Sequence, residues 1–137
     1  MMRNQSGYPD PTAEAAIEHV LAEQHSQERR PLVYICVPCG GNFAGNTRKA
    51  RVYSQFAVKQ QKTPIAPQLF FPQILGKVET AGTRKIARQM EKQIIRKCRE
   101  LWWFGKEPTE GMKEEIRIAM WEGLIVKHFN EGCEEVA

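Results

Sequence analysis

The sequence has few features of a membrane or secreted protein. A segment that crosses a bilayer needs about 20 consecutive apolar residues, and no run in this sequence is close to that length. The first residues also lack the apolar core of a signal peptide. Its four cysteines, Cys36, Cys39, Cys98 and Cys133, are too few and too irregularly spaced for a disulfide-stabilised scaffold. The chain contains no internal repeat or low-complexity tract. We therefore expect a cytoplasmic protein with no membrane partner.

The common nucleotide, redox and metal motifs are also missing. The Gly-rich stretch "PCGGNFAGN" has neither the GK[ST] of a Walker loop nor the GxGxxG of a dinucleotide site. Cys36 and Cys39 form a CxxC pair, but Cys36 lies within a predicted strand, whereas a redox pair prefers a helix N-terminus. Cys98, His128 and Cys133 are scattered, and a zinc site needs a second close pair of ligands. We predict no metal and no cofactor.

The length and composition of the chain fit one globular domain of moderate size. Of the 137 residues, 42% are hydrophobic and 26% are charged, which is close to the averages of globular proteins. The net charge is +4 and the sequence pI is about 9.0. Mild basicity suits an anionic ligand such as a nucleotide, although it does not select one.

The hydrophobic pattern predicts alternating strands and helices after residue 30. Residues 1–30 are polar with one short helix, and we expect them to form an appended arm. Strand and helix patterns then alternate, with strands at 32–38, 64–67, 100–105 and 124–129 and helices at 46–62, 83–99 and 110–122. This alternation indicates a doubly wound, flavodoxin- or Rossmann-like α/β domain over residues 31–137, with a parallel sheet of four or five strands.

Ligands of open parallel sheets bind outside the carboxyl ends of the strands. We therefore place the site among three loops that follow strands, at 38–46, 67–75 and 105–112. In the first loop, Gly40 and Gly41 would let the backbone approach a ligand. Asn42 and Asn46 lie where the next helix begins, and a helix N-terminus favours an anion. A flexible connection that needs glycine for its turn is the alternative.

The second loop, "APQLFFPQIL", is apolar and interrupted by prolines. With Gln68 and Phe70 it would form a stiff wall against a planar ring at the ligand edge of the sheet. The alternatives are that this segment folds back into the core or contacts another subunit.

The last predicted helix carries two adjacent carboxylates about one turn from its start. Thr109 and Glu110 precede Gly111, where they cap the helix and favour its positive end. Glu114 and Glu115 point about 100° apart, and Glu115 lies nearer the side that packs on the sheet. A partly desolvated Glu115 directed towards the loops would suit a covalent nucleophile. A solvated helix charge is the alternative.

The segments "VYICVP", "GGNFAGN", "PIAPQLFFPQIL", "ELWWFG" and "TEGMKEEIRIAMWEG" resemble the nucleoside 2-deoxyribosyltransferase-like superfamily, in particular its branch of small proteins from phages and bacterial mobile elements. The resemblance covers roughly residues 31–129. It implies a doubly wound α/β fold, at least a homodimer, and cleavage of the N-glycosidic bond between a base and a ribose or deoxyribose.

The resemblance also implies roles for individual residues. In the family, a glutamate four residues after a glycine at the helix start attacks the anomeric carbon, and this spacing joins Gly111 to Glu115. A tyrosine of the first strand orients that nucleophile, and Tyr34 stands at the matching place. The residues at the start of this helix are those that we expect beside the substrate, namely Thr109, Glu110, Gly111 and Met112.

This sequence departs from the family pattern at three places. Thr109 replaces the aspartate of the transferases that act on nucleosides, and the branch that hydrolyses nucleoside monophosphates has a 5′-phosphate-binding serine there. Threonine is close to serine, so the resemblance favours a phosphorylated ligand. For a second carboxylate on the preceding helix, Glu91 is the nearest candidate, which leaves the general acid unassigned. The C-terminal asparagine of the transferases is not clearly matched.

The sequence therefore predicts a protein that binds a nucleoside or nucleoside monophosphate and cleaves or exchanges its N-glycosidic bond. A non-catalytic protein that sequesters or senses a nucleotide is the first alternative. The second is a nucleic-acid-associated protein that uses the basic helix at 84–99, where Arg84, Arg88, Lys92 and Arg96 form a stripe at four-residue steps. Such a stripe also fits the solvated back of an amphipathic helix, so nucleic acid is not the partner that we expect.

Overall fold

The computed structural model describes residues 12–19, 29–38, 42–76, 78 and 80–137. The chain divides into two compact units, Met1–Arg30 and Pro31–Ala137. In the first unit, residues 12–19 form a helix, in agreement with the short helix predicted there. The remaining elements all belong to the second unit.

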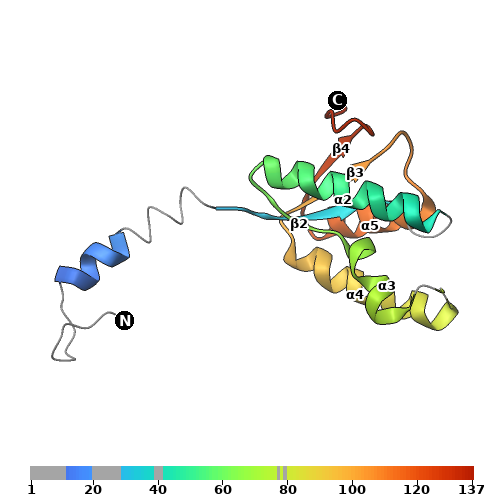
Figure 1. Ribbon diagram of the computed structural model, residues 1–137, viewed down its shortest axis with the longest axis horizontal. Helices are drawn as coiled ribbons and strands as arrows, with labels where there is room; N and C mark the ends of the chain where they lie inside the picture. The colour runs from blue at the N-terminus through green and yellow to red at the C-terminus, as the bar shows by residue number, and fades with distance from the viewer. Residues whose placement is uncertain (1–11, 20–28, 39–41, 77, 79) are drawn as a thin grey trace. The chain divides into compact units, whose positions relative to one another are not determined.

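The second unit is built on a parallel sheet (Figure 1). Its four strands are β1 (Leu32–Cys36), β2 (Thr63–Ile65), β3 (Glu100–Phe104) and β4 (Ile125–Phe129). They lie in the order β2-β1-β3-β4, and every neighbouring pair is parallel. The doubly wound α/β fold predicted from the sequence is therefore confirmed, with four strands within the described residues.

Helices connect these strands. They are α2 (Phe43–Lys59), α3 (Phe71–Leu75), α4 (Ala81–Lys97) and α5 (Glu110–Trp121), with a 3₁₀ helix, η1, at Pro67–Leu69. α2 begins three residues before the predicted start, because the Asn42 side chain caps it by accepting a hydrogen bond from the backbone N–H of Gly45 at 3.0 Å. None of the helices in the described part of the chain is long and apolar enough to cross a membrane.

The prediction of an irregular loop at 67–75 was wrong. This segment forms η1 and α3, and each of these helices has a proline in its first two positions. Proline lacks a backbone N–H, but the first N–H groups of a helix have no partner within the helix, so Pro67 and Pro72 initiate helices there.

Two apolar layers enclose the sheet, because successive strand residues point to opposite faces. On one face α2 packs over a cluster that includes Val33, Ile35 and Trp102. On the other face α4 and α5 pack over Tyr34, Cys36 and Leu101 of the sheet. Ile95 of α4 and Met112 of α5 belong to the same cluster. Trp102 and Trp103 point to opposite faces of the sheet, since each contributes to a different cluster.

The strand order locates the ligand edge of the sheet. From β1 the chain moves outward to β2, then returns to add β3 and β4 on the other side of β1. In doubly wound sheets this reversal opens a crevice at the carboxyl ends of the two central strands, where ligands bind. Here those strands are β1 and β3, and α5 begins six residues after β3 ends.

Candidate functional site

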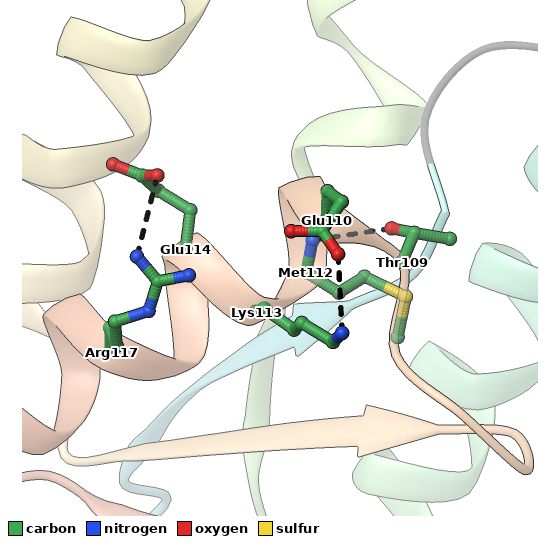
Figure 2. A network of polar contacts seen from close by, with 6 residues as sticks. All are labelled: Thr109, Glu110, Met112, Lys113, Glu114 and Arg117. Carbon is green, nitrogen blue, oxygen red and sulfur yellow. Dashed lines mark hydrogen bonds and ion pairs between the residues drawn. The ribbon is translucent and has the colours of Figure 1, made fainter.

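The start of α5 is fixed by its own side chains (Figure 2). The Thr109 hydroxyl accepts a hydrogen bond from the Met112 backbone N–H at 3.2 Å and so caps the helix. Glu110 is exposed and its carboxylate lies 3.2 Å from the Lys113 ammonium group. The Thr109 hydroxyl proton is still able to donate to a ligand, whereas Glu110 is on the surface and stabilises the helix end.

The two adjacent glutamates lie in different environments. Glu114 is half-buried and its carboxylate lies 3.9 Å from the Arg117 guanidinium group, as Figure 2 shows. Glu115 is 7% exposed. Glu115 therefore lies on the inner side of α5, as its position on the helix predicts, and Glu114 is an ordinary surface charge.

Two side chains of β1 hold the Glu115 carboxylate. Tyr34 and Cys36 are separated by one residue, so they point to the same face of the sheet, and both side chains hydrogen-bond to Glu115. The Tyr34 side chain is almost completely buried and the Cys36 side chain is completely buried. Cys36 Sγ also lies 3.9 Å from the Met112 carbonyl oxygen, so it links β1 to the first turn of α5. The carboxylate is therefore oriented by donors from a rigid strand.

A second carboxylate, on α4, acts on the Glu115 carboxylate. Glu91 is half-buried and acts electrostatically on both Glu115 and Tyr34. The sequence suggested Glu91 as the nearest candidate for a second carboxylate, and the fold brings it to Glu115 across the contact between α4 and α5. Three elements of the fold, β1, α4 and α5, thus supply the carboxylate cluster, by which we mean Glu115, Glu91, Tyr34 and Cys36.

The ionisation of the cluster follows from its burial. Burial raises the pKa of Glu115 to about 8, and repulsion by Glu91 acts in the same direction, while the hydrogen bonds from Tyr34 and Cys36 oppose the shift. Burial and the neighbouring glutamates also raise the pKa of Tyr34 well above its usual value. Tyr34 is therefore a neutral donor at every physiological pH. Glu115 therefore retains its proton near neutral pH.

The remaining predicted site residues lie around the α2 end of the same edge. Asn42 uses its side chain to cap α2, and Asn46 is buried in the first turns of that helix. Gln68 is buried and donates a hydrogen bond to the Thr47 hydroxyl at 3.4 Å, while Phe70 is 38% exposed and packs edge-to-face on the neighbouring ring of Phe71. The predicted residues Gly40 and Gly41 lie outside the described residues.

Cys36 is the member of the cluster that the sequence analysis did not assign to the site. It was considered as half of a CxxC motif, whose other half, Cys39, lies outside the described residues. The available signal was the two-residue spacing from Tyr34, which places both side chains on one face of a strand. In the part of the chain that the structure describes, no three His, Cys, Asp or Glu residues could together hold a metal ion.

We expect the loss of either donor to make Glu115 harder to ionise. Tyr34→Phe and Cys36→Ala each remove a hydrogen bond that favours the carboxylate, so the pKa of Glu115 should rise in both variants. Cys36→Ser keeps a donor of similar size and should change it least. The measurement is a titration of the Glu115 carboxyl carbon by NMR in the parent and the three variants. An unchanged pKa in both Tyr34→Phe and Cys36→Ala would show that these side chains do not hold the carboxylate.

Comparison with known proteins connects this geometry to a family. Residues 31–129 match the family described as a domain of unknown function, DUF7768. The chain belongs to this family. The DUF7768 match runs from the residue before β1 to the last residue of β4, so it contains the whole sheet and the carboxylate cluster.

A solved structure is also similar to this DUF7768 protein. It is described as a 2-deoxyribosyltransferase from the psychrotolerant bacterium Bacillus psychrosaccharolyticus. The sequence identity is 14%, the match covers 72% of each chain, and the TM-score is 0.56. A comparison with curated proteins gives no match. The similarity to the solved structure shows that the two proteins share the fold.

Proposed function

We propose that the protein binds a nucleoside or nucleotide at the carboxyl ends of β1 and β3 and cleaves or exchanges its N-glycosidic bond. The observation that carries this proposal is the buried Glu115 carboxylate, held by Tyr34 and Cys36 at the topological switch point of the sheet. The shared fold with a 2-deoxyribosyltransferase supports the same chemistry. As the sequence resemblance implies, we also propose a protein of phage or mobile-element type that acts as at least a homodimer, and from the sequence composition we propose a cytoplasmic location.

In the proposed reaction the two carboxyl groups have different tasks. An oxygen of the ionised Glu115 forms a bond to the anomeric carbon as the bond from that carbon to the base nitrogen breaks. The proton that Glu115 holds near neutral pH passes to Glu91 before the attack, and Glu91 donates it to the departing nitrogen. Water, or the nitrogen of a second base, next attacks the anomeric carbon and releases Glu115, and Glu91 takes the proton of the attacking group. Repulsion between the two carboxyls disfavours the state in which both are ionised.

The start of α5 suits a phosphate on the sugar. A helix N-terminus attracts anions through its unpaired N–H groups and its dipole. Thr109 caps that terminus, and Glu115 lies on the same helix one and a half turns further on. A nucleoside monophosphate would therefore place its 5′-phosphate at Thr109 and Gly111 with its anomeric carbon towards Glu115.

A non-catalytic binding protein is the second candidate. The observation that favours it is the raised pKa of Glu115, about 8, because a protonated Glu115 is a hydrogen-bond donor and a poor nucleophile. Such a site would recognise a base or sugar hydroxyl and release it unchanged.

Release of free base distinguishes the two candidates. Ribo- and deoxyribonucleosides and their 5′-monophosphates would be incubated with the parent, Glu115→Gln and Glu114→Gln, and the bases quantified by chromatography. We expect release by the parent and by Glu114→Gln, with a loss of at least about 1,000-fold in Glu115→Gln, because a covalent nucleophile has no substitute. Equal release by parent and Glu115→Gln would sink the proposed nucleophile. Intact nucleotides recovered from the bound parent would favour the binding protein.

A further inference from the structure

One hollow of the molecular surface is lined by residues that are not part of the carboxylate cluster. It has a volume of about 540 Å³ and runs along one side of α4 from its N-cap. Among the described residues that line it, four are cationic and none is acidic; these residues are Thr80, Ala81, Arg84, Lys85, Arg88, Gln89 and Lys92. A concave surface of this kind concentrates positive potential.

The cations stand where helix energetics disfavours them. Arg84, Arg88 and Lys92 follow one another at four-residue steps, and like charges at this spacing repel across a helix turn. Arg84 and Lys85 also lie near the positive end of the helix dipole, and the first turn of α4 contains no acidic residue. An anion bound in the hollow would relieve both effects.

Some other cations of this domain are paired with carboxylates. Lys62 lies 2.9 Å from Glu100, and Arg96 lies 3.1 Å from Glu122. Arg96 is the fourth member of the stripe that the sequence shows, but it is paired with Glu122 and is not among the residues that line the hollow. By contrast, Lys85, Arg88 and Lys92 form no ion pair with any residue that the structure describes.

We propose that this hollow binds the phosphodiester backbone of a nucleic-acid strand. From Arg84 to Lys92 the helix rises by about 12 Å, which is enough for several phosphates in succession rather than one. Among the described lining residues there is no aromatic side chain to stack on the bases, so binding depends on the backbone charge and tolerates any sequence. This binding needs no chemistry at Glu115, so it holds or fails independently of the proposed glycosidic reaction.

Fluorescence anisotropy with a labelled single strand of about 20 nucleotides tests this proposal. The full chain would be compared with Arg84→Gln/Arg88→Gln/Lys92→Gln at several salt concentrations. Each phosphate contact to a single strand contributes about 0.7 to the slope of log affinity against log salt, so the triple variant should lower that slope by about 2. Its affinity near physiological salt should fall by at least about tenfold.

The matched control removes the same charge from the opposite side of the sheet. Arg48→Gln/Arg51→Gln/Lys59→Gln changes three exposed residues of α2, which packs on the other face from α4. It should keep the parent slope and most of the affinity. Glutamine is a good helix former, and the α4 variant relieves like-charge repulsion, so its Tm should equal or exceed that of the parent.

Three results would overturn the proposal. One is the absence of strand binding by the parent at low salt. Another is an equal loss of affinity in the α2 and α4 variants, which would mean that net charge alone attracts the strand. The third is displacement of the strand by adenosine monophosphate at the same total phosphate concentration, which would indicate a site for one nucleotide.

Discussion

Glu115→Gln is expected to stabilise the fold at alkaline pH by about 2 kcal/mol, and by almost nothing near pH 5. The pKa of this carboxyl is raised from about 4.5 to about 8 in the folded protein, mainly by burial. Between those two values the folded state binds more protons than the unfolded state, so stability falls as pH rises through the folded pKa. Glutamine cannot ionise, so the variant avoids that loss. Each unit of pKa shift corresponds to about 1.4 kcal/mol, and relaxation of the buried site reduces the total.

Urea denaturation of the parent, Glu115→Gln and Glu114→Gln at pH values from about 5 to 9 measures this effect. The range begins at pH 5 because Glu100 acts oppositely. Burial raises the pKa of Glu100, but hydrogen bonds from Trp102 and Lys62 outweigh this effect and lower it overall. The contribution of Glu100 is therefore present above its unfolded pKa and is lost as pH falls through the lower folded value. Parallel pH dependences for the parent and Glu115→Gln would refute a buried, proton-binding Glu115.

Trp102→Ala is expected to destabilise the domain by about 3–5 kcal/mol, the usual cost of deleting a buried aromatic side chain. Trp102 is 2% exposed and its ring packs against Phe56 and Phe129, with centroid distances of 5.7 and 4.8 Å. Its indole N–H also donates a hydrogen bond to the buried Glu100 carboxylate at 3.0 Å. The variant therefore leaves a cavity between α2 and the sheet and removes a donor from a buried charge.

Trp121→Ala is the matched control, since the Trp121 side chain is 90% exposed at the end of α5. Its cost should stay within about 0.5 kcal/mol. Thermal and urea unfolding of both variants would be compared with the parent. Similar destabilisation by both substitutions would contradict the packing of Trp102 between the sheet and α2.

The order of strands and helices was predictable because the helices have a clear hydrophobic period and the strands are distinct runs in the sequence. The runs that contain Tyr34, Trp102 and His128 are apolar and short, which is typical of buried parallel strands. The segment around Phe70 was not predictable. Its prolines favour either a loop or a helix start, and only tertiary packing, in which Leu69 contacts the core cluster and Phe71 is buried, decides between these structures.

The candidate site was predictable in part. The inner position of Glu115 follows from its place on the apolar stripe of α5, and Tyr34 follows from the family resemblance. Glu91 belongs to α4, so its approach to Glu115 depends on how two helices pack, and spacing within one helix carries no information on that distance. Cys36 was not assigned to the site because it was considered only as part of a CxxC motif. On α4 the charged residues were visible in the sequence, but the hollow that Arg88 and Lys92 line was not predictable from it.

The central claim is that Glu115 forms a bond to the sugar. Its most direct test is mass spectrometry of the parent after incubation with a 2-deoxyribonucleoside or its 5′-monophosphate, acid quenching and proteolysis. The account predicts one added deoxyribosyl or deoxyribosyl phosphate unit on Glu115, no such addition in Glu115→Gln, and a normal addition in Glu114→Gln. An adduct on any other residue, or base release by the parent with Glu115 unmodified throughout the reaction, would contradict it.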